Sequence, residues 1–391
     1  MDSLEELIDI AKNSQDLAHI DNAKLKALAG RFEENTPHGT RSAAKNRLVE
    51  QLIGVEHLKK GVTGSCETLI RTYVYLTKDV KVNNISDIVK EYPLVLSCTI
   101  ENAIKPKIEY LQSIGVKNIK KVIERTPRAM GISLEENIMP TVEYLRSIGI
   151  DDVGKVIEKY SPVLTYSLEE RTKKIVGYLK TLKIKNVSKV IEKSPGILGH
   201  SIERTIKPKV KFLRDIGVKK VYKVVERFPN LLLYSIEETM GPRVEYLRSV
   251  GVKNVGKAVT SLPQVLELSI ERTMHPRVEY FKSIGIFDMG KFIENMPAVL
   301  EYNLDSTKQK VEFYMSKGYT VSDIEEFPAS LGYSIKKRIM PRFAFLESIG
   351  KKFPDTKLRR ILQSCDEKFP ERFTTDKDAY NNFCAANKCS F

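Results

Sequence analysis

The chain has 391 residues, of which 42% are hydrophobic, so it can bury a sizeable core and is not disordered throughout. It carries 64 Lys and Arg residues against 50 Asp and Glu residues, and the net charge of +14 favours an acidic partner such as nucleic acid. The sequence lacks a run of about 18 apolar residues, so we expect a soluble protein with no membrane partner.

Residues 1–62 are predicted to form an N-terminal helical extension. Leucines at helical spacing precede and follow a loop at residues 36–40. A weak likeness to small DNA-binding SAP modules is the alternative to a plain helical cap. The early acidic residues Asp2, Glu5 and Glu6 are not typical of a transit peptide, so we expect either no presequence or one already removed.

A repeat of about 34 residues organises the middle of the chain. Prolines recur at nearly constant spacing in eight copies, and a second proline follows 13 residues later in six of them. Lys174 and Gln309 stand in its place in the other two copies. A fixed period of this length is the signature of stacked structural repeats. The first prolines are Pro93, Pro127, Pro162, Pro195, Pro229, Pro263, Pro297 and Pro328.

Each copy is predicted to contain two helices joined by a short turn. The first helix must end before the first proline, because proline disfavours helical geometry in the residue that precedes it. Residues Ser133 to Glu136 have the spacing of a capping box, Pro140 suits the first turn of the second helix, and Gly149 suits the position after its end. We therefore predict an all-α superhelical solenoid of about eight repeats.

The repeat array is expected to cover residues 63–350, with a degenerate closing helix at 63–81 that caps it. Residues 351–391 are predicted to contain one helix at 358–365 and a loosely ordered tail. The five cysteines, Cys66, Cys98, Cys365, Cys384 and Cys389, form no CxxC pair, so we expect a reducing compartment and no metal site.

The repeated motif identifies a family. The string P-x-V/I-x-Y/F-L/F-x-S/D-I/V-G, as at residues 242–251, is followed by V/I-x-x-V/I-x-K-V/A-V/I and then by x-x-x-P-x-V/L-L. This pattern resembles the mitochondrial transcription termination factor (mTERF) family over residues 82–350, and residues 358–373 are similar to the ending that follows its last repeat. Tetratricopeptide and pentatricopeptide arrays fit less well, because the former need small residues at helix crossings and the latter lack the internal proline.

The resemblance implies a left-handed superhelical array whose units each hold two α-helices and a short 3₁₀ turn. It also implies an organellar protein, in the mitochondrion or plastid, that binds nucleic acid through a positively charged groove. Members of this family terminate or regulate organellar transcription, and some act in RNA splicing or ribosome assembly.

Charge is concentrated in the array, where residues 63–350 carry 46 basic and 34 acidic residues. One set of lysines, here called the lysine series, repeats every 34 residues. Glutamates three residues later in most copies favour simple i,i+3 ion pairs on a solvated surface, with phosphate binding as the alternative. The lysine series is Lys121, Lys155, Lys189, Lys223, Lys257 and Lys291.

A second set, here called the post-proline cations, directly follows the second proline. These residues are expected in the first turn of a helix, where the helix dipole disfavours cations, so phosphate contact is weighed evenly against a structural role. Arg204, Arg272 and Arg338 lie slightly upstream in their copies and are further candidates. The post-proline cations are Lys107, Lys209, Arg243, Arg277 and Arg342.

The sequence shows neither a catalytic constellation nor a phosphate-binding glycine loop, and its five histidines, His57 among them, are scattered. We therefore expect a non-enzymatic protein without a cofactor that binds double-stranded organellar DNA as a monomer and terminates or regulates transcription. The alternatives are RNA binding for intron splicing or ribosome assembly, and a scaffold for a protein partner. Recurrent tyrosines such as Tyr110 and Tyr246 are expected to pack in the core rather than stack on bases.

Overall fold

The computed structural model describes residues 3–56, 58, 61–376 and 378–387, so that His57 and Cys389 lie outside the described residues. The chain divides into two compact units, Met1–Ile202 and Glu203–Phe391. This division falls inside the repeat array, and the three-part organisation at residues 62 and 350 stays a prediction. Secondary structure in the described residues is helical, without a strand, and the predicted all-α class is confirmed.

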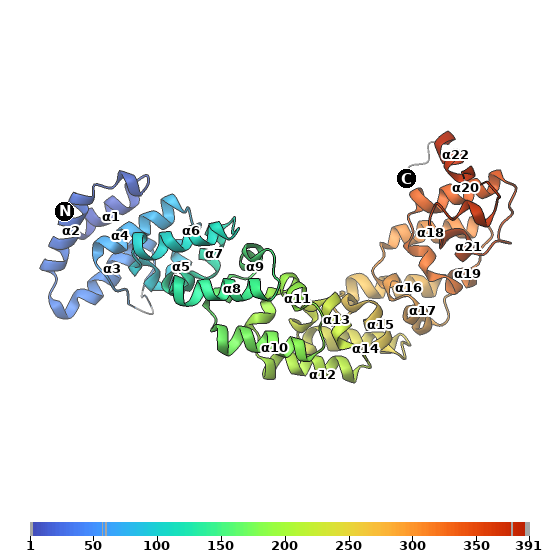
Figure 1. The fold of residues 1–391 in the computed structure, drawn as a ribbon, viewed down its shortest axis with the longest axis horizontal. Coiled ribbons are helices and arrows are strands. Elements are labelled where there is room, and N and C mark those ends of the chain that lie inside the picture. Colours follow the sequence, from blue (N-terminus) through green and yellow to red (C-terminus); the bar gives the residue numbers. More distant parts are fainter. Residues whose placement is uncertain (1–2, 57, 59–60, 377, 388–391) are drawn as a thin grey trace. The chain divides into compact units, whose positions relative to one another are not determined.

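Each repeat of the array contains a short first helix followed by a longer second helix, and both series are labelled in Figure 1. The first helix of a repeat has six or seven residues, which is about two turns, and the second helix is longer. The first helices are α5 (Ile85–Glu91), α7 (Ile119–Arg125), α9 (Val153–Lys159), α11 (Val187–Lys193), α13 (Val221–Arg227), α15 (Val255–Ser261), α17 (Met289–Asn295) and α19 (Val321–Glu326). The second helices are α6 (Lys105–Ser113), α8 (Met139–Ser147), α10 (Lys174–Thr181), α12 (Lys207–Asp215), α14 (Gly241–Ser249), α16 (His275–Ser283), α18 (Leu304–Ser316) and α20 (Met340–Ser348).

The first proline of each repeat begins or lies within a 3₁₀ turn, such as Pro93–Ser97, Pro127–Gly131 and Pro263–Leu266. The residue before it leaves the helical conformation, with ψ of 68° at Thr126 and 83° at Leu262, and the preceding helix ends there because proline cannot donate the next backbone hydrogen bond. The turn buries its apolar side chains: Val95 and Leu96 are both fully buried. The predicted pairing of two helices with a 3₁₀ turn is confirmed.

A π-helical turn precedes most second helices, which the sequence did not predict. The amide of Ile104 bonds to the carbonyl of Thr99, five residues back, and Met240 bonds likewise to Ser235. A wider turn accommodates the proline ring that follows, which would clash with a carbonyl in a regular helix. Helix α18, with Gln309 in place of the proline, is α-helical throughout, although the third repeat keeps a π-helical turn without a proline.

The core of each unit lies between the first helices, the 3₁₀ turns and the second helices. Successive 3₁₀ turns contact each other, and so do α7 and α9 in the first unit and α13, α15 and α17 in the second. Burying a leucine side chain contributes about 1.5–3 kcal/mol, so neighbouring repeats stabilise one another. One leucine of the second helix is fully buried in six repeats, as Leu111, Leu145, Leu179, Leu213, Leu247 and Leu346.

Both flanks are helical. The N-terminal extension contains α1 (Ser3–Asn13), α2 (Asn22–Asn35) and α3 (Arg41–Ile53), which pack with α4 (Cys66–Val74). Helix α4 lies within the predicted capping segment.

At the other end, α21 (Leu358–Leu362) is shorter than predicted, and α22 (Ala379–Ala386) packs on α20. The prediction of a loosely ordered tail is wrong for the described residues, because Tyr380 is fully buried and its ring lies 4.9 Å from that of Phe369.

Candidate nucleic-acid interface

The lysine series occupies the third residue of the first helix in six repeats. In five of these repeats, all but that of α13, a polar residue just before the helix caps it: the amide of Lys121 donates to Asn118 Oδ1 at 3.0 Å, and that of Lys155 donates to Asp152 Oδ1 at 2.8 Å. This cap fixes the backbone of the lysine and leaves its side chain directed to the surface. All six side chains of the series are exposed.

Three of the glutamates that lie three residues further along, Glu124, Glu158 and Glu294, hold the preceding repeat instead of pairing with these lysines. Oε1 of Glu158 accepts the amide of Asn118 at 2.8 Å, and Oε1 of Glu294 accepts the amides of Lys253 and Asn254 at 2.7 and 2.8 Å. Glu124 accepts the amide of Asn83 in the same way, at 2.7 Å. The i,i+3 interpretation is therefore wrong for these glutamates, which bind loops about 40 residues earlier in the chain.

The series is thus a set of exposed cations without carboxylate partners. Among the described residues, the ion pairs include none of the six lysines. A cation in the first turn of a helix is unfavourable by about 0.3–1 kcal/mol because the helix dipole is positive there. These charges therefore do not stabilise the helices that carry them, whereas they would attract a negatively charged ligand.

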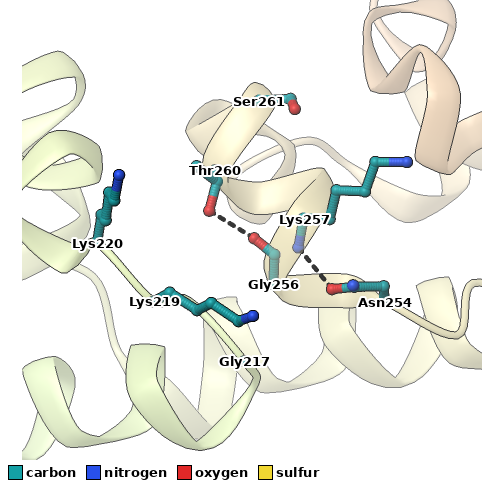
Figure 2. Close-up of a pocket in the computed structure, with 8 residues that line it drawn as sticks. All are labelled: Gly217, Lys219, Lys220, Asn254, Gly256, Lys257, Thr260 and Ser261. Carbon is teal, nitrogen blue, oxygen red and sulfur yellow. Dashed lines mark hydrogen bonds between the residues drawn. The ribbon is translucent and has the colours of Figure 1, made fainter.

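In the second unit a basic pocket forms beside one member of the series (Figure 2). It measures about 360 Å³ and lies between the turn that leads into α13 and the helix α15. Its lining holds three lysines and no carboxylate, so it offers an anion both charge and hydrogen-bond donors. The lining residues are Gly217, Lys219, Lys220, Asn254, Gly256, Lys257, Thr260 and Ser261.

Two glycines bring the repeats together at this pocket. A Cβ atom on Gly256 would lie 2.2 Å from the carbonyl carbon of Gly217, so only glycine allows the helix start to rest against the preceding turn. Gly217 itself has φ of +93°, the left-handed conformation that the sequence pattern predicts after a second helix. Figure 2 shows the Lys219 side chain extending toward the start of α15, with Lys220 on the other side of the pocket and the Lys257 ammonium directed away from both.

The post-proline cations donate hydrogen bonds to backbone carbonyl groups, which favours their structural role over contact with phosphate. Nζ of Lys107 donates to the carbonyl of Met130 at 2.7 Å, and Nζ of Lys209 donates to that of Leu232 at 2.8 Å. Both side chains are buried, and burial lowers the pKa of each from its usual value. Nε of Arg243 donates to Leu268 O and Nε of Arg277 to Tyr302 O. These carbonyls belong to the next repeat, where the 3₁₀ turn ends.

Arg342 is the most deeply buried member of this set. It is 0% exposed, and its guanidinium donates to the carbonyls of Ile361 and Ser364 and to Oδ1 of Asp366, at 2.7, 2.7 and 2.6 Å. Sequence reasoning missed an equivalent residue, Lys310, whose buried Nζ donates to the carbonyl of Leu331 at 2.7 Å. The sequence feature that could have identified Lys310 is its position directly after Gln309, which replaces the second proline.

The remaining candidates lie on the turn before the second helix. Arg338 places its guanidinium 5.0 Å from the ring centre of Tyr333, a cation–π contact, and is half-buried. Arg272 and Arg204 are exposed on the π-helical turns of their repeats. These three residues are not lining residues of the basic pocket.

An exposed aromatic side chain also escaped the sequence analysis. Phe287 is 97% exposed and lies two residues before α17, four residues before Lys291. Its signal is an apolar residue at a position where neighbouring repeats have Lys219 or Lys253. The recurrent tyrosines, by contrast, are half-buried, and burial raises the pKa of Tyr246 to about 12.

Two other classes of site were sought in the described part of the chain. There, groups of three or more His, Cys, Asp or Glu side chains able to hold a metal ion do not occur. Nor is any helix of those residues both long and apolar enough to span a membrane.

Comparison with known protein families identifies a relationship. The sequence model of the mTERF family matches residues 75–370, which is most of the chain and includes every member of the lysine series. Comparison with curated proteins finds no match.

Proposed function

The chain belongs to the mTERF family of nucleic-acid-binding helical repeat proteins, and on that premise we propose that it binds duplex DNA in an organelle, mitochondrion or plastid. It terminates or otherwise regulates transcription there, without a catalytic step or a cofactor, and acts as a monomer. The observation that carries the proposal is the lysine series: six exposed cations at equivalent positions, three of which precede a glutamate that binds a loop of the preceding repeat.

The chemistry of the series suits the phosphate backbone rather than the bases. Lysine is a compact charge that neutralises phosphates and releases their counterions, which gives affinity that is largely independent of sequence. Lys219 and Lys220 add two charges beside Lys257 in the basic pocket. Duplex DNA carries one negative charge per about 1.7 Å of helix axis, a denser charge than that of a single strand, so it gains more than a single strand from a repeated series of cations.

Buried cations take no part in this interface. The post-proline cations, for which phosphate contact was weighed evenly against a structural role, hold carbonyl groups of the segment that follows their own repeat. Removing Lys107 or Arg342 from those carbonyls would leave buried polar groups unpaired, which costs about 1–3 kcal/mol for each group. The proposed interface therefore consists of the lysine series and the lysines of the preceding turns.

Structured RNA is the second candidate ligand, and Phe287 is the observation that favours it. A fully exposed ring next to Lys291 suits stacking on an unpaired base, which RNA loops present and a closed duplex does not. On this alternative, Phe287→Ala weakens RNA binding and leaves duplex binding unchanged.

Crosslinking in the native organelle tests the proposal, with bound DNA and RNA recovered and sequenced separately. DNA peaks near promoters or transcript ends would support the transcriptional role. Peaks confined to introns or ribosomal RNA would replace it with RNA processing. Binding to both nucleic acids that does not weaken with salt would contradict the phosphate interface itself.

A further inference from the structure

The third residue of the first helix changes sign at both ends of the array. In six consecutive repeats it is a lysine of the lysine series. In the first repeat, on α5, it is Asp87, and in the eighth repeat, on α19, it is Asp323. Asp87 is exposed, like the lysines at the same helical position.

The two aspartates are what helix stability alone would select at this position. Oδ2 of Asp323 accepts both the amide and the hydroxyl of Thr320 at 2.8 Å, which completes a capping box. Asp87 interacts with the side chain of Asn84, the N-cap residue of α5. An acid also complements the positive end of the helix dipole, whereas a lysine opposes it. The six central repeats therefore depart from the stable choice, and the end repeats keep it.

The residues around these positions change in the same direction. In the second unit, the pocket between the turn that leads into α13 and the helix α15 has three lysines in its lining. The pocket between α17 and α19 is instead lined by Asp288, Glu325 and Glu326, with Lys291 as its one cation. This second pocket measures about 480 Å³. The surface along the second unit therefore turns from basic to acidic where the lysine series ends.

We propose that Asp87 and Asp323 are electrostatic end stops: Asp87 ends the nucleic-acid contact made by the three series lysines of the first unit, and Asp323 ends the contact made by those of the second. Each compact unit supplies three lysines of the series, and the carboxylate beyond the third repels the phosphate that would come next. This inference rests on the proposed nucleic-acid binding, and it adds that the two aspartates limit the length of nucleic acid that the protein contacts.

The test is to turn one stop into a further contact. Asp87→Lys should steepen the dependence of log affinity on log salt by about 0.9, the value of one added duplex phosphate contact, and raise affinity several-fold at low salt. Asp87→Asn removes the repulsion without adding a contact, so it should raise affinity less and leave the slope unchanged. Nested duplexes of increasing length should show that Asp87→Lys also lengthens the shortest duplex bound at full affinity.

Glu143→Lys is the matched control, because it makes the same charge change at an exposed site on α8 of the same unit. Equal effects of Asp87→Lys and Glu143→Lys on slope and duplex length would overturn the end stop. Asp323→Asn tests the other end without placing a lysine in the capping box, and it should raise affinity once its melting temperature confirms folding. Failure of the proposed function would give a different result from failure of the end stops. In that case, neutralising the lysine series would leave nucleic-acid binding intact, irrespective of the effects of the aspartate substitutions.

Discussion

Replacing Lys223, Lys257 and Lys291 together with glutamine should abolish most nucleic-acid binding while leaving the fold intact. A lysine and a phosphate 4 Å apart in water attract by about 1 kcal/mol, so three lost contacts cost about 3 kcal/mol, or roughly a 100-fold loss of affinity. The slope of log affinity against log salt should fall by about 2.7 on duplex DNA.

The triple glutamine variant should keep the thermal stability of the parent protein even though its affinity for nucleic acid falls. The three side chains are exposed and make no ion pair in the described structure, and each lies in a first helical turn where a cation is unfavourable. Fluorescence anisotropy with a labelled duplex over a salt series measures affinity and slope, and thermal melting by circular dichroism measures stability.

A second triple variant, Lys211→Gln with Arg214→Gln and Arg248→Gln, is the matched control. These residues are exposed on the second helices α12 and α14 of the same unit, so the same charge is lost from another surface. Equal losses of affinity in the two variants would refute the assignment and leave only net charge. Unfolding of the first variant would refute the claim that the lysine series is dispensable for the fold.

Three further predictions concern the packing that positions the lysines. Arg342→Ala should destabilise the second unit by about 3–5 kcal/mol in chemical denaturation, because it leaves Asp366 and buried carbonyls unpaired, and an unchanged midpoint would contradict this. Gly256→Ala should lower stability by about 1–3 kcal/mol through its contact with Gly217, whereas Gly177→Ala, on an open face of α10, should be neutral or stabilising by melting temperature. Glu294→Gln should keep the melting temperature within a few degrees but weaken duplex binding mildly in anisotropy, because a neutral amide holds the loop of Lys253 less firmly.

The repeat architecture was predictable because its determinants are local. A proline ends the helix before it, and a glycine such as Gly217 takes the left-handed conformation after one, whatever the rest of the chain does. The serine caps are equally local: Oγ of Ser133 accepts the amide of Glu136 at 3.0 Å, as its spacing predicts. The π-helical turns were not predictable by the same means, since one forms without a proline.

Assigning the cations needed coordinates, because their partners lie in neighbouring repeats. Lys107 finds its carbonyl 23 residues away, and Glu158 finds its amide 40 residues away. The spacing of residues within one helix reveals neither of these partners. The sequence analysis therefore counted the buried Lys107 as a candidate phosphate contact and favoured an ion pair for Glu158, which in fact binds a loop. The lysine series was singled out correctly as a repeated feature, but its freedom from ion pairs follows only from where the glutamates lie.

The central claim is that nucleic acid contacts the first-helix lysines and the turns before them. Photocrosslinking of a bound duplex, followed by mass spectrometry of the attached peptides, locates the contact directly. We expect crosslinks within residues 117–121, 219–223 and 253–257. Crosslinks confined to the second helices, or to the peptides that contain Lys107 and Arg342, would contradict the account.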